Sequence, residues 1–227
     1  MKILHTADWH LGQTFYEYDR REEHFHFLEW LKQQIKQHEI DVLLIAGDVF
    51  DSPNPSAESQ RVYYRFLREV TSENPSLQIV IIAGNHDSAA RLEAPNPLLE
   101  DMNIIVRGTV RRNAEGDIDL QHFIVPLYTE GKVTAYCLAV PYLRQGDYPS
   151  AENYSKGVQQ LYEQLFNKVK EKGIPVVAMG HLQATGSEIS EDDRSERTVI
   201  GGLECVSPDA FNEAITYTAL GHLHRSQ

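Results

Sequence analysis

The chain has 227 residues, of which 41% are hydrophobic, so it is long enough to bury one large core. Its formal net charge of −12 argues against a surface that attracts nucleic acid everywhere, because phosphate binding normally leaves a basic footprint. No apolar run approaches the ~20 residues of a membrane-spanning helix. The first residues also lack a signal-peptide pattern, so we expect a cytoplasmic protein with no membrane partner. The two cysteines, Cys137 and Cys205, lie far apart and indicate neither a disulfide framework nor a zinc knuckle.

From the N-terminus, short apolar runs alternate with helical patterns, which is typical of a sheet whose strands are joined by helices. Strands are expected at residues 3–4, 42–46 and 79–83, and helices at 22–37 and 56–70. The alternation predicts an α/β fold.

The second half of the chain predicts a second sheet. Residues 107–134 are polar and rich in turn formers, so we expect hairpins or loops that lead into a strand at 136–140. A helix is expected at 155–172, followed by a strand at 176–179. The charged stretch 188–197 is predicted to be a solvated loop. We expect one domain over residues 1–227.

Five short polar motifs each follow an apolar, strand-like run. They are Asp8-Trp9-His10, Gly47-Asp48-Val49-Phe50-Asp51, Gly84-Asn85-His86-Asp87, Gly180-His181 and Gly221-His222-Leu223-His224. In open α/β sheets ligands bind at the carboxyl ends of the strands, so the five turns can converge on one site. Each motif alone favours a plain turn or a helix cap, whereas the ordered set of five indicates a functional site.

The residue types in these motifs are those that two divalent metal ions require. Such ions lie ~3.5–4 Å apart and need several oxygen and imidazole ligands, with one carboxylate to bridge them. Asp48 is the natural bridge. Mixed carboxylate, amide and imidazole ligands favour manganese or iron over magnesium and exclude the thiolate sites of structural zinc.

The five motifs resemble those of the calcineurin-like metallophosphoesterases, from Asp8 to His224. The resemblance implies an α/β fold in which a two-sheet β-sandwich is flanked by helices and carries a dimetal site at the strand ends. The implied ligands are Asp8, His10 and His224 for a first metal ion, Asn85, His181 and His222 for a second, and Asp48 as the bridge.

The same resemblance implies catalytic roles for two neighbouring residues. His86 would be the catalytic histidine beside the scissile phosphate, and Asp87 would orient its ring. Two other residues near the ligands are expected to be structural. His5 is predicted to be a satisfied core histidine, although it could line the site, and Trp9 is predicted to pack in the core.

Longer strings around the first, second and fifth motifs resemble the SbcD family of bacterial nuclease subunits. They are residues 5–12, 47–51 and 221–225. Archaeal relatives carry a second histidine where this chain has Asp51, whereas the bacterial branch usually carries aspartate. The resemblance implies a manganese-dependent nuclease with two Mn²⁺ ions, DNA as substrate and an SbcC-type ATPase as partner. The implied activities are exonuclease on double-stranded ends and endonuclease on single strands and hairpins.

The resemblance also bears on assembly. SbcD relatives continue past the fifth motif with capping and ATPase-binding regions, so this chain is expected to be the N-terminal nuclease portion. A homodimer is implied, built from the helices after the second and third motifs. The residues proposed for it are Val62, Tyr63, Tyr64, Phe66, Leu67, Leu92, Leu98 and Leu99. The apolar face of an isolated amphipathic helix normally packs on its own sheet, but Tyr63 and Tyr64 lie on adjoining sides, so one can face the sheet and the other a partner.

Two alternative functions are compatible with the same motifs. One is a calcineurin-like phosphodiesterase that acts on a nucleotide or another small phosphoester, and the acidic net charge slightly favours it. The other is an interaction scaffold that has lost its metals. A scaffold should show gaps in the ligand set, and the motifs show none.

Overall fold

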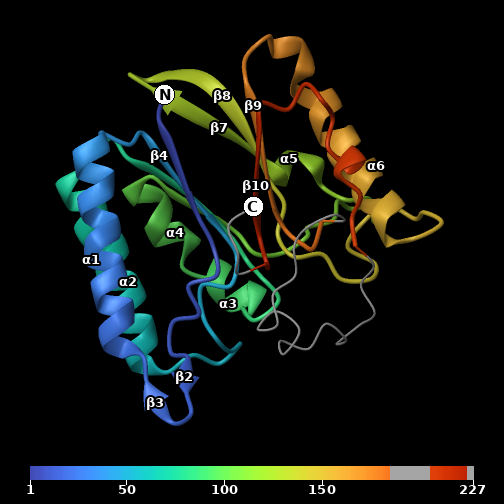
Figure 1. Cartoon of the computed structure of the whole chain (residues 1–227). Coiled ribbons are helices and arrows are strands. Elements are labelled where there is room, and N and C mark those ends of the chain that lie inside the picture. Colours follow the sequence, from blue (N-terminus) through green and yellow to red (C-terminus); the bar gives the residue numbers. More distant parts are fainter. Residues whose placement is uncertain (185–204, 224–227) are drawn as a thin grey trace.

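The computed structural model describes residues 1–184 and 205–223, and two sheets stand at its centre (Figure 1). The first sheet is four-stranded and parallel throughout, in the order β1-β4-β5-β6. Its strands are β1 (Ile3–Thr6), β4 (Val42–Ala46), β5 (Gln78–Ile82) and β6 (Ile104–Arg107). The strands predicted in the first half of the chain are therefore confirmed to within a few residues.

The second sheet is also four-stranded, in the order β10-β9-β8-β7. Its strands are β7 (Ile124–Thr129), β8 (Lys132–Ala139), β9 (Val176–His181) and β10 (Tyr217–Gly221). β7 and β8 form an antiparallel hairpin, whereas β9 runs parallel to both of its neighbours. The expectation that 107–134 leads into a second sheet is confirmed.

Helices cover the outer faces of both sheets, as Figure 1 shows. The longer ones are α1 (Arg21–His38), α2 (Ala57–Glu73) and α6 (Tyr154–Val169). The short ones are α3 (Ala89–Glu93), α4 (Asn96–Leu99) and α5 (Leu120–Phe123), with 3-10 turns η1 (Glu100–Met102), η2 (Lys170–Lys172) and η3 (Pro208–Ala210). A small hairpin, β2 (Thr14–Phe15) with β3 (Tyr18–Asp19), precedes α1.

Alternation along β4 shows how the layers are joined. Leu43 and Ile45 point into a core shared with α1 and α2, whereas Val42, Leu44 and Ala46 point into a core between the two sheets. Successive side chains of a strand face opposite sides, so a strand buried on both faces reads as an unbroken apolar run. A third core lies between the second sheet and α6. The predicted two-sheet sandwich flanked by helices is confirmed.

The apolar face of α2 belongs to this core. The helix begins where predicted, because the Ser56 hydroxyl accepts a hydrogen bond from the Ser59 amide and caps the first turn. The four residues proposed for a dimer contact are at most 6% exposed and pack among the residues of the first sheet. They are Val62, Tyr63, Phe66 and Leu67. The prediction that this face contacts a second copy is wrong, because the chain's own sheet covers it.

Two further side chains, Trp9 and Cys137, lie in the core. Trp9 is buried against Phe66 and Phe27, as predicted, and Cys137 is buried. The predicted loop at 188–197 lies outside the described residues. Among the helices that the structure describes, none has both the length and the apolar character needed to cross a bilayer.

Phe66→Ala tests the assignment of the α2 face to the core. Phe66 is 2% exposed, so truncation should leave a cavity and lower the free energy of unfolding by ~3–5 kcal/mol. The matched control is Arg65→Ala on the exposed face of the same helix. This substitution should change the free energy of unfolding by no more than ~0.5 kcal/mol. Urea denaturation of both variants measures the difference, and equal stability would contradict the assignment.

Candidate metal centre

The five motifs converge because each follows the carboxyl end of a strand. Asp8, Asp48 and Asn85 lie two or three residues beyond β1, β4 and β5 of the first sheet. His181 is the last residue of β9, and His222 follows β10, in the second sheet. The carboxyl ends of β1, β4 and β5 and of β9 and β10 are therefore lined with carboxylate, amide and imidazole groups.

Asn85 and two histidines form one half of the cluster. His181 Nε2 lies 3.0 Å from Asn85 Oδ1, and His222 Nδ1 lies 3.0 Å from the same oxygen. The two imidazole rings meet edge to face, with centroids 5.2 Å apart. These three residues are the ones predicted to hold the second metal.

Asp48 joins this half to the other. Its Oδ2 atom lies 3.2 Å from His181 Nε2 and 3.8 Å from His10 Nε2. Asp8, Asp48 and His181 each offer a ligand atom within 4.8 Å of the others, and Asp8 accepts the His222 backbone amide at 3.0 Å. Six of the seven predicted ligands thus lie in one cluster, with Asp48 in the middle. The seventh, His224, lies outside the described residues.

The imidazole of His181 shows that the cluster suits a cation. Its Nδ1 atom lies 2.8 Å from the Ala46 carbonyl oxygen, which can only accept, so Nδ1 carries the proton. In the neutral ring, Nε2 then carries a lone pair, and this lone pair faces the oxygens of Asn85 and Asp48. Acceptors that face one another at these distances need a positive charge between them, as a proton or as a metal ion.

Burial adds to this demand for positive charge. Asp48 is 1% exposed, and burial alone would raise its pKa, but the neighbouring His181, the His86 amide and His10 hold the pKa of the carboxyl well below its usual range. Burial alone would lower the pKa of His181, yet the Asp48 carboxylate raises it. The oxygen and imidazole donors, without thiolate, fit a divalent cation of the manganese or iron type.

Backbone conformation brings the ligands into place. Four of the cluster residues have left-handed backbone angles, which side-chain-bearing residues adopt at a cost of ~1–3 kcal/mol each. They are Asp8 (φ 56°), His10 (φ 45°), Asp48 (φ 49°) and His222 (φ 96°). Such angles cluster at functional sites, where the surrounding structure enforces them.

Two motif glycines are required for close approach. A Cβ atom on Gly47 would lie 2.2 Å from His181 Nδ1, and one on Gly84 would lie 2.0 Å from Asp48 Oδ1. No side chain can be accommodated at these distances, so the loops reach the ligands only because both residues are glycine.

The catalytic pair expected from the third motif lies in the cluster, but not as predicted. The His86 ring is 4.8 Å from the His10 ring, and its Nδ1 atom donates to the Asp51 carbonyl oxygen at 2.9 Å. Asp87 is buried, and its carboxylate accepts the backbone amides of Val49, Phe50 and Gly84. The prediction that Asp87 orients the His86 ring is therefore wrong, because its oxygens are turned toward the backbone.

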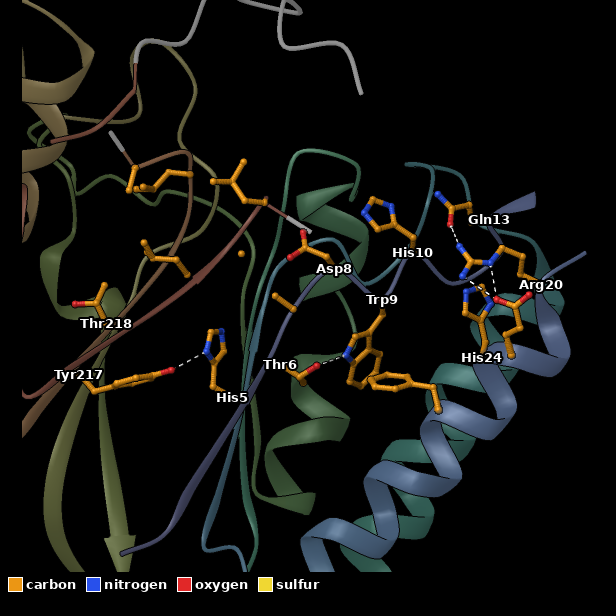
Figure 2. A pocket seen from close by; sticks show the side chains of 18 residues that line it. His5, Thr6, Asp8, Trp9, His10, Gln13, Arg20, His24, Tyr217 and Thr218 are labelled. Carbon is orange, nitrogen blue, oxygen red and sulfur yellow. Dashed lines mark hydrogen bonds and ion pairs between the residues drawn. The ribbon is translucent and has the colours of Figure 1, made fainter. Parts of the chain in front are cut away.

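A cavity of about 930 Å³ opens beside Asp8 and His10. Figure 2 shows His5 and Tyr217 on one side of it and Arg20 and His24 on the side of α1. His5 is half-buried, with Nδ1 3.0 Å from the Tyr217 hydroxyl, and it lines this cavity. The prediction that His5 is a core histidine is therefore wrong, and the alternative, a position lining the site, is the one observed.

Two partners in the cluster were missed by sequence reasoning. The carbonyl oxygens of Ala46 and Asp51 hold ring nitrogens of His181 and His86, and a backbone group leaves no signal in the sequence. The Asp51 carboxylate also lies 3.3 Å from His10 Nδ1. The sequence places Asp51 in the second motif, but it does not indicate that the Asp51 carboxylate lies beside His10.

The sequence matches a family model and several curated proteins. The model for calcineurin-like phosphoesterases matches residues 1–226. The SbcD subunit of the nuclease SbcCD from Rhodobacter capsulatus is 42% identical over 100% of this chain and 58% of its own length. Its counterparts in Escherichia coli K12 and Bacillus subtilis are 32% and 30% identical, with 57% and 58% of their lengths covered. The chain thus spans less than two thirds of these relatives.

Among solved structures, the nuclease MPE of Pseudomonas putida is 17% identical, with 82% of this chain and 66% of that chain covered and a TM-score of 0.33. The family model, by contrast, matches nearly the whole chain and includes all five strand-end motifs. Because those motifs also meet in one cluster of carboxylate, amide and imidazole side chains, sequence and geometry agree: the chain belongs to the calcineurin-like phosphoesterase family.

Proposed function

We propose that the chain is a metal-dependent DNA nuclease whose centre holds two divalent cations, most suitably Mn²⁺. The observation that carries the proposal is the position of Asp48, whose Oδ2 faces both His10 and His181. A carboxylate shared between two sets of ligands is the arrangement that a two-metal centre requires.

The ligands divide into two sets around that carboxylate. Asp8 and His10 would hold the first cation together with His224, and Asn85, His181 and His222 would hold the second. When bound, the cations would activate water for in-line attack and neutralise charge on the phosphate oxygens.

His86 is the proposed catalytic residue. Because its Nδ1 donates to the Asp51 carbonyl, Nε2 is left for a phosphate oxygen or a leaving oxygen. The protonated ring would stabilise developing charge there or supply a proton. Its backbone amide has a separate task, since it donates to Asp48 Oδ1 at 2.9 Å and orients the bridge.

The choice of DNA as substrate is supported by the relatives, which are named nuclease subunits of SbcCD. We propose exonuclease action on double-stranded ends and endonuclease action on single strands and hairpins, with an SbcC-type ATPase as partner. The formal net charge of −12 weakens the binding of a polyanion such as DNA, and a partner that binds DNA would compensate for this.

The same charge favours a second candidate, a phosphodiesterase that acts on a nucleotide or another small phosphoester. Such an enzyme would use the same metal ligands and would need no extended basic surface. The two candidates differ in substrate and agree in chemistry.

Asp48→Ala and His86→Ala should differ in what they lose. Asp48→Ala removes the shared carboxylate and should abolish tight binding of Mn²⁺, which isothermal titration calorimetry measures. His86→Ala keeps the backbone amide that orients Asp48, so it should bind two Mn²⁺ while turnover of bis-p-nitrophenyl phosphate falls ~100-fold or more. Equal metal loss in both variants would contradict the role given to His86.

A substrate panel with Mn²⁺ separates the two candidates. We expect hydrolysis of bis-p-nitrophenyl phosphate and of hairpin or single-stranded DNA, and weak activity on long duplex DNA, because the acidic chain captures a duplex poorly. Cyclic nucleotides should not be hydrolysed. Turnover of cyclic nucleotides without any cleavage of DNA would support the second candidate instead.

A homodimer is part of the proposal, with a smaller contact than the one first expected. Of the three leucines after the third motif, Leu92 and Leu99 are buried, but Leu98 on α4 is 74% exposed. On α2, Tyr64 is half-buried at the edge of the core. A two-fold contact around Leu98 would cover this leucine in both copies without disturbing the core.

Leu98→Glu should convert the dimer to a monomer, because it places a charge at the centre of the proposed contact. Light scattering at micromolar concentration measures the mass. The matched control is Tyr128→Glu, since Tyr128 is a large exposed side chain on β7 of the second sheet. A monomeric wild type, or a dimer that tolerates Leu98→Glu, would rule this contact out.

A further inference from the structure

Three histidines at the centre have Nδ1 close to an oxygen of the chain. Nδ1 of His181 and Nδ1 of His86 are hydrogen-bonded to the Ala46 and Asp51 carbonyl oxygens at 2.8 Å and 2.9 Å. Nδ1 of His10 lies 3.3 Å from the Asp51 carboxylate, which is an ion-pair distance without the geometry of a hydrogen bond. An oxygen beside Nδ1 favours the tautomer with the proton on that atom. The Nε2 atom then carries the lone pair that can bind a cation or, once protonated, a phosphate oxygen.

Asp51 supplies two of these three oxygens. We propose that Asp51 is a positioning residue that acts on both halves of the reaction machinery. Its backbone carbonyl sets the tautomer of His86, and its carboxylate holds the ring of His10 so that Nε2 points toward Asp48. This inference deepens the proposed two-metal function and rests on it.

The location of Asp51 suits such a task because its loop is held on both sides. The Asp51 amide donates to the Leu11 carbonyl at 3.3 Å, just beyond His10. The preceding residues Val49 and Phe50 donate their amides to the buried Asp87 carboxylate. The backbone of Asp51 is therefore fixed to the first and third motifs, and its side chain, 35% exposed, lies beside the His10 ring.

A different assignment for the same residues is a separate metal site. His10, Asp51 and His86 each offer a ligand atom, and these atoms lie within 4.8 Å of one another. Against it, His86 Nδ1 already donates to a carbonyl, and His10 Nε2 faces Asp48 on the opposite side of its ring from Asp51. An ion there would have to displace contacts that the ligand set uses, so positioning is the better account.

The two contributions of Asp51 can be separated by substitution, because only one of them comes from the side chain. Asp51→Ala removes the carboxylate from His10 but keeps the carbonyl that holds His86. Loss of a group that orients a metal ligand typically weakens metal affinity ~10–100-fold. We therefore expect one Mn²⁺ to bind ~10–100-fold more weakly, while the second Mn²⁺ binds as in wild type.

The experiment combines Mn²⁺ titration calorimetry with a spectroscopic readout on the metal-free protein. Long-range ¹H–¹⁵N correlation spectra report the tautomer of each histidine ring. In wild type, His10 should be protonated on Nδ1, and in Asp51→Ala it should become a mixture, while His86 remains unchanged. Asp51→Asn keeps an acceptor oxygen, so it should retain part of the wild-type Mn²⁺ affinity and part of the Nδ1-protonated form of His10. Asp101→Asn, an exposed acid on η1, is the matched control and should change neither.

Two outcomes would overturn the proposal. One is an Asp51→Ala protein with wild-type Mn²⁺ affinity and an unchanged His10 tautomer. The other is a wild type that binds three ions and an Asp51→Ala variant that binds two, which would assign the residue to a separate metal site. Neither readout depends on turnover, so failure to cleave any phosphodiester would count against the proposed function alone.

Discussion

The buried carboxylate of Asp48 is the constraint on which the centre depends. At 1% exposure a lone carboxylate would be costly, and it persists only where donors or cations surround it. The chain supplies one backbone amide, from His86, and two imidazole rings, from His10 and His181. The further acceptor oxygens of Asp8 and Asn85 leave the cluster short of positive charge. Two divalent cations would supply the missing positive charge. The electrostatics of the cluster and the family to which the chain belongs therefore both indicate bound divalent metal ions.

The need to surround Asp48 explains the unusual backbone around it. Gly47 and Gly84 let two loops approach to distances at which a methyl group would overlap His181 or Asp48 itself. Asp8 and Asp48 adopt left-handed angles that L-residues normally avoid. The core between helices and sheets provides the stability that holds these turns, because both sheets are buried on two faces. The strained backbone at the strand ends is thus a consequence of packing polar side chains closely around Asp48.

Sequence reasoning was most accurate where the chemistry is carried by side chains at strand ends. β4 lies at the residues predicted, and α2 begins one residue after its predicted start. It was less accurate where a pattern has two physical solutions. The apolar face containing Phe66 could pack on a sheet or on a partner, and only the fold decides between them. β7 was hidden because Pro126 interrupts a short apolar run within a polar segment.

Asp87 shows why the remaining errors were unavoidable. A carboxylate next to a histidine that is predicted to be catalytic resembles a residue that orients the ring, yet its oxygens accept the amides of Val49, Phe50 and Gly84. A carboxylate offers about four lone-pair positions, so it can satisfy three amides at once. Burial raises the pKa of Asp87, and these amides oppose that shift. The residue therefore ties the loops of the second and third motifs to each other. That task depends on which loops meet in space, and no spacing along the chain records it.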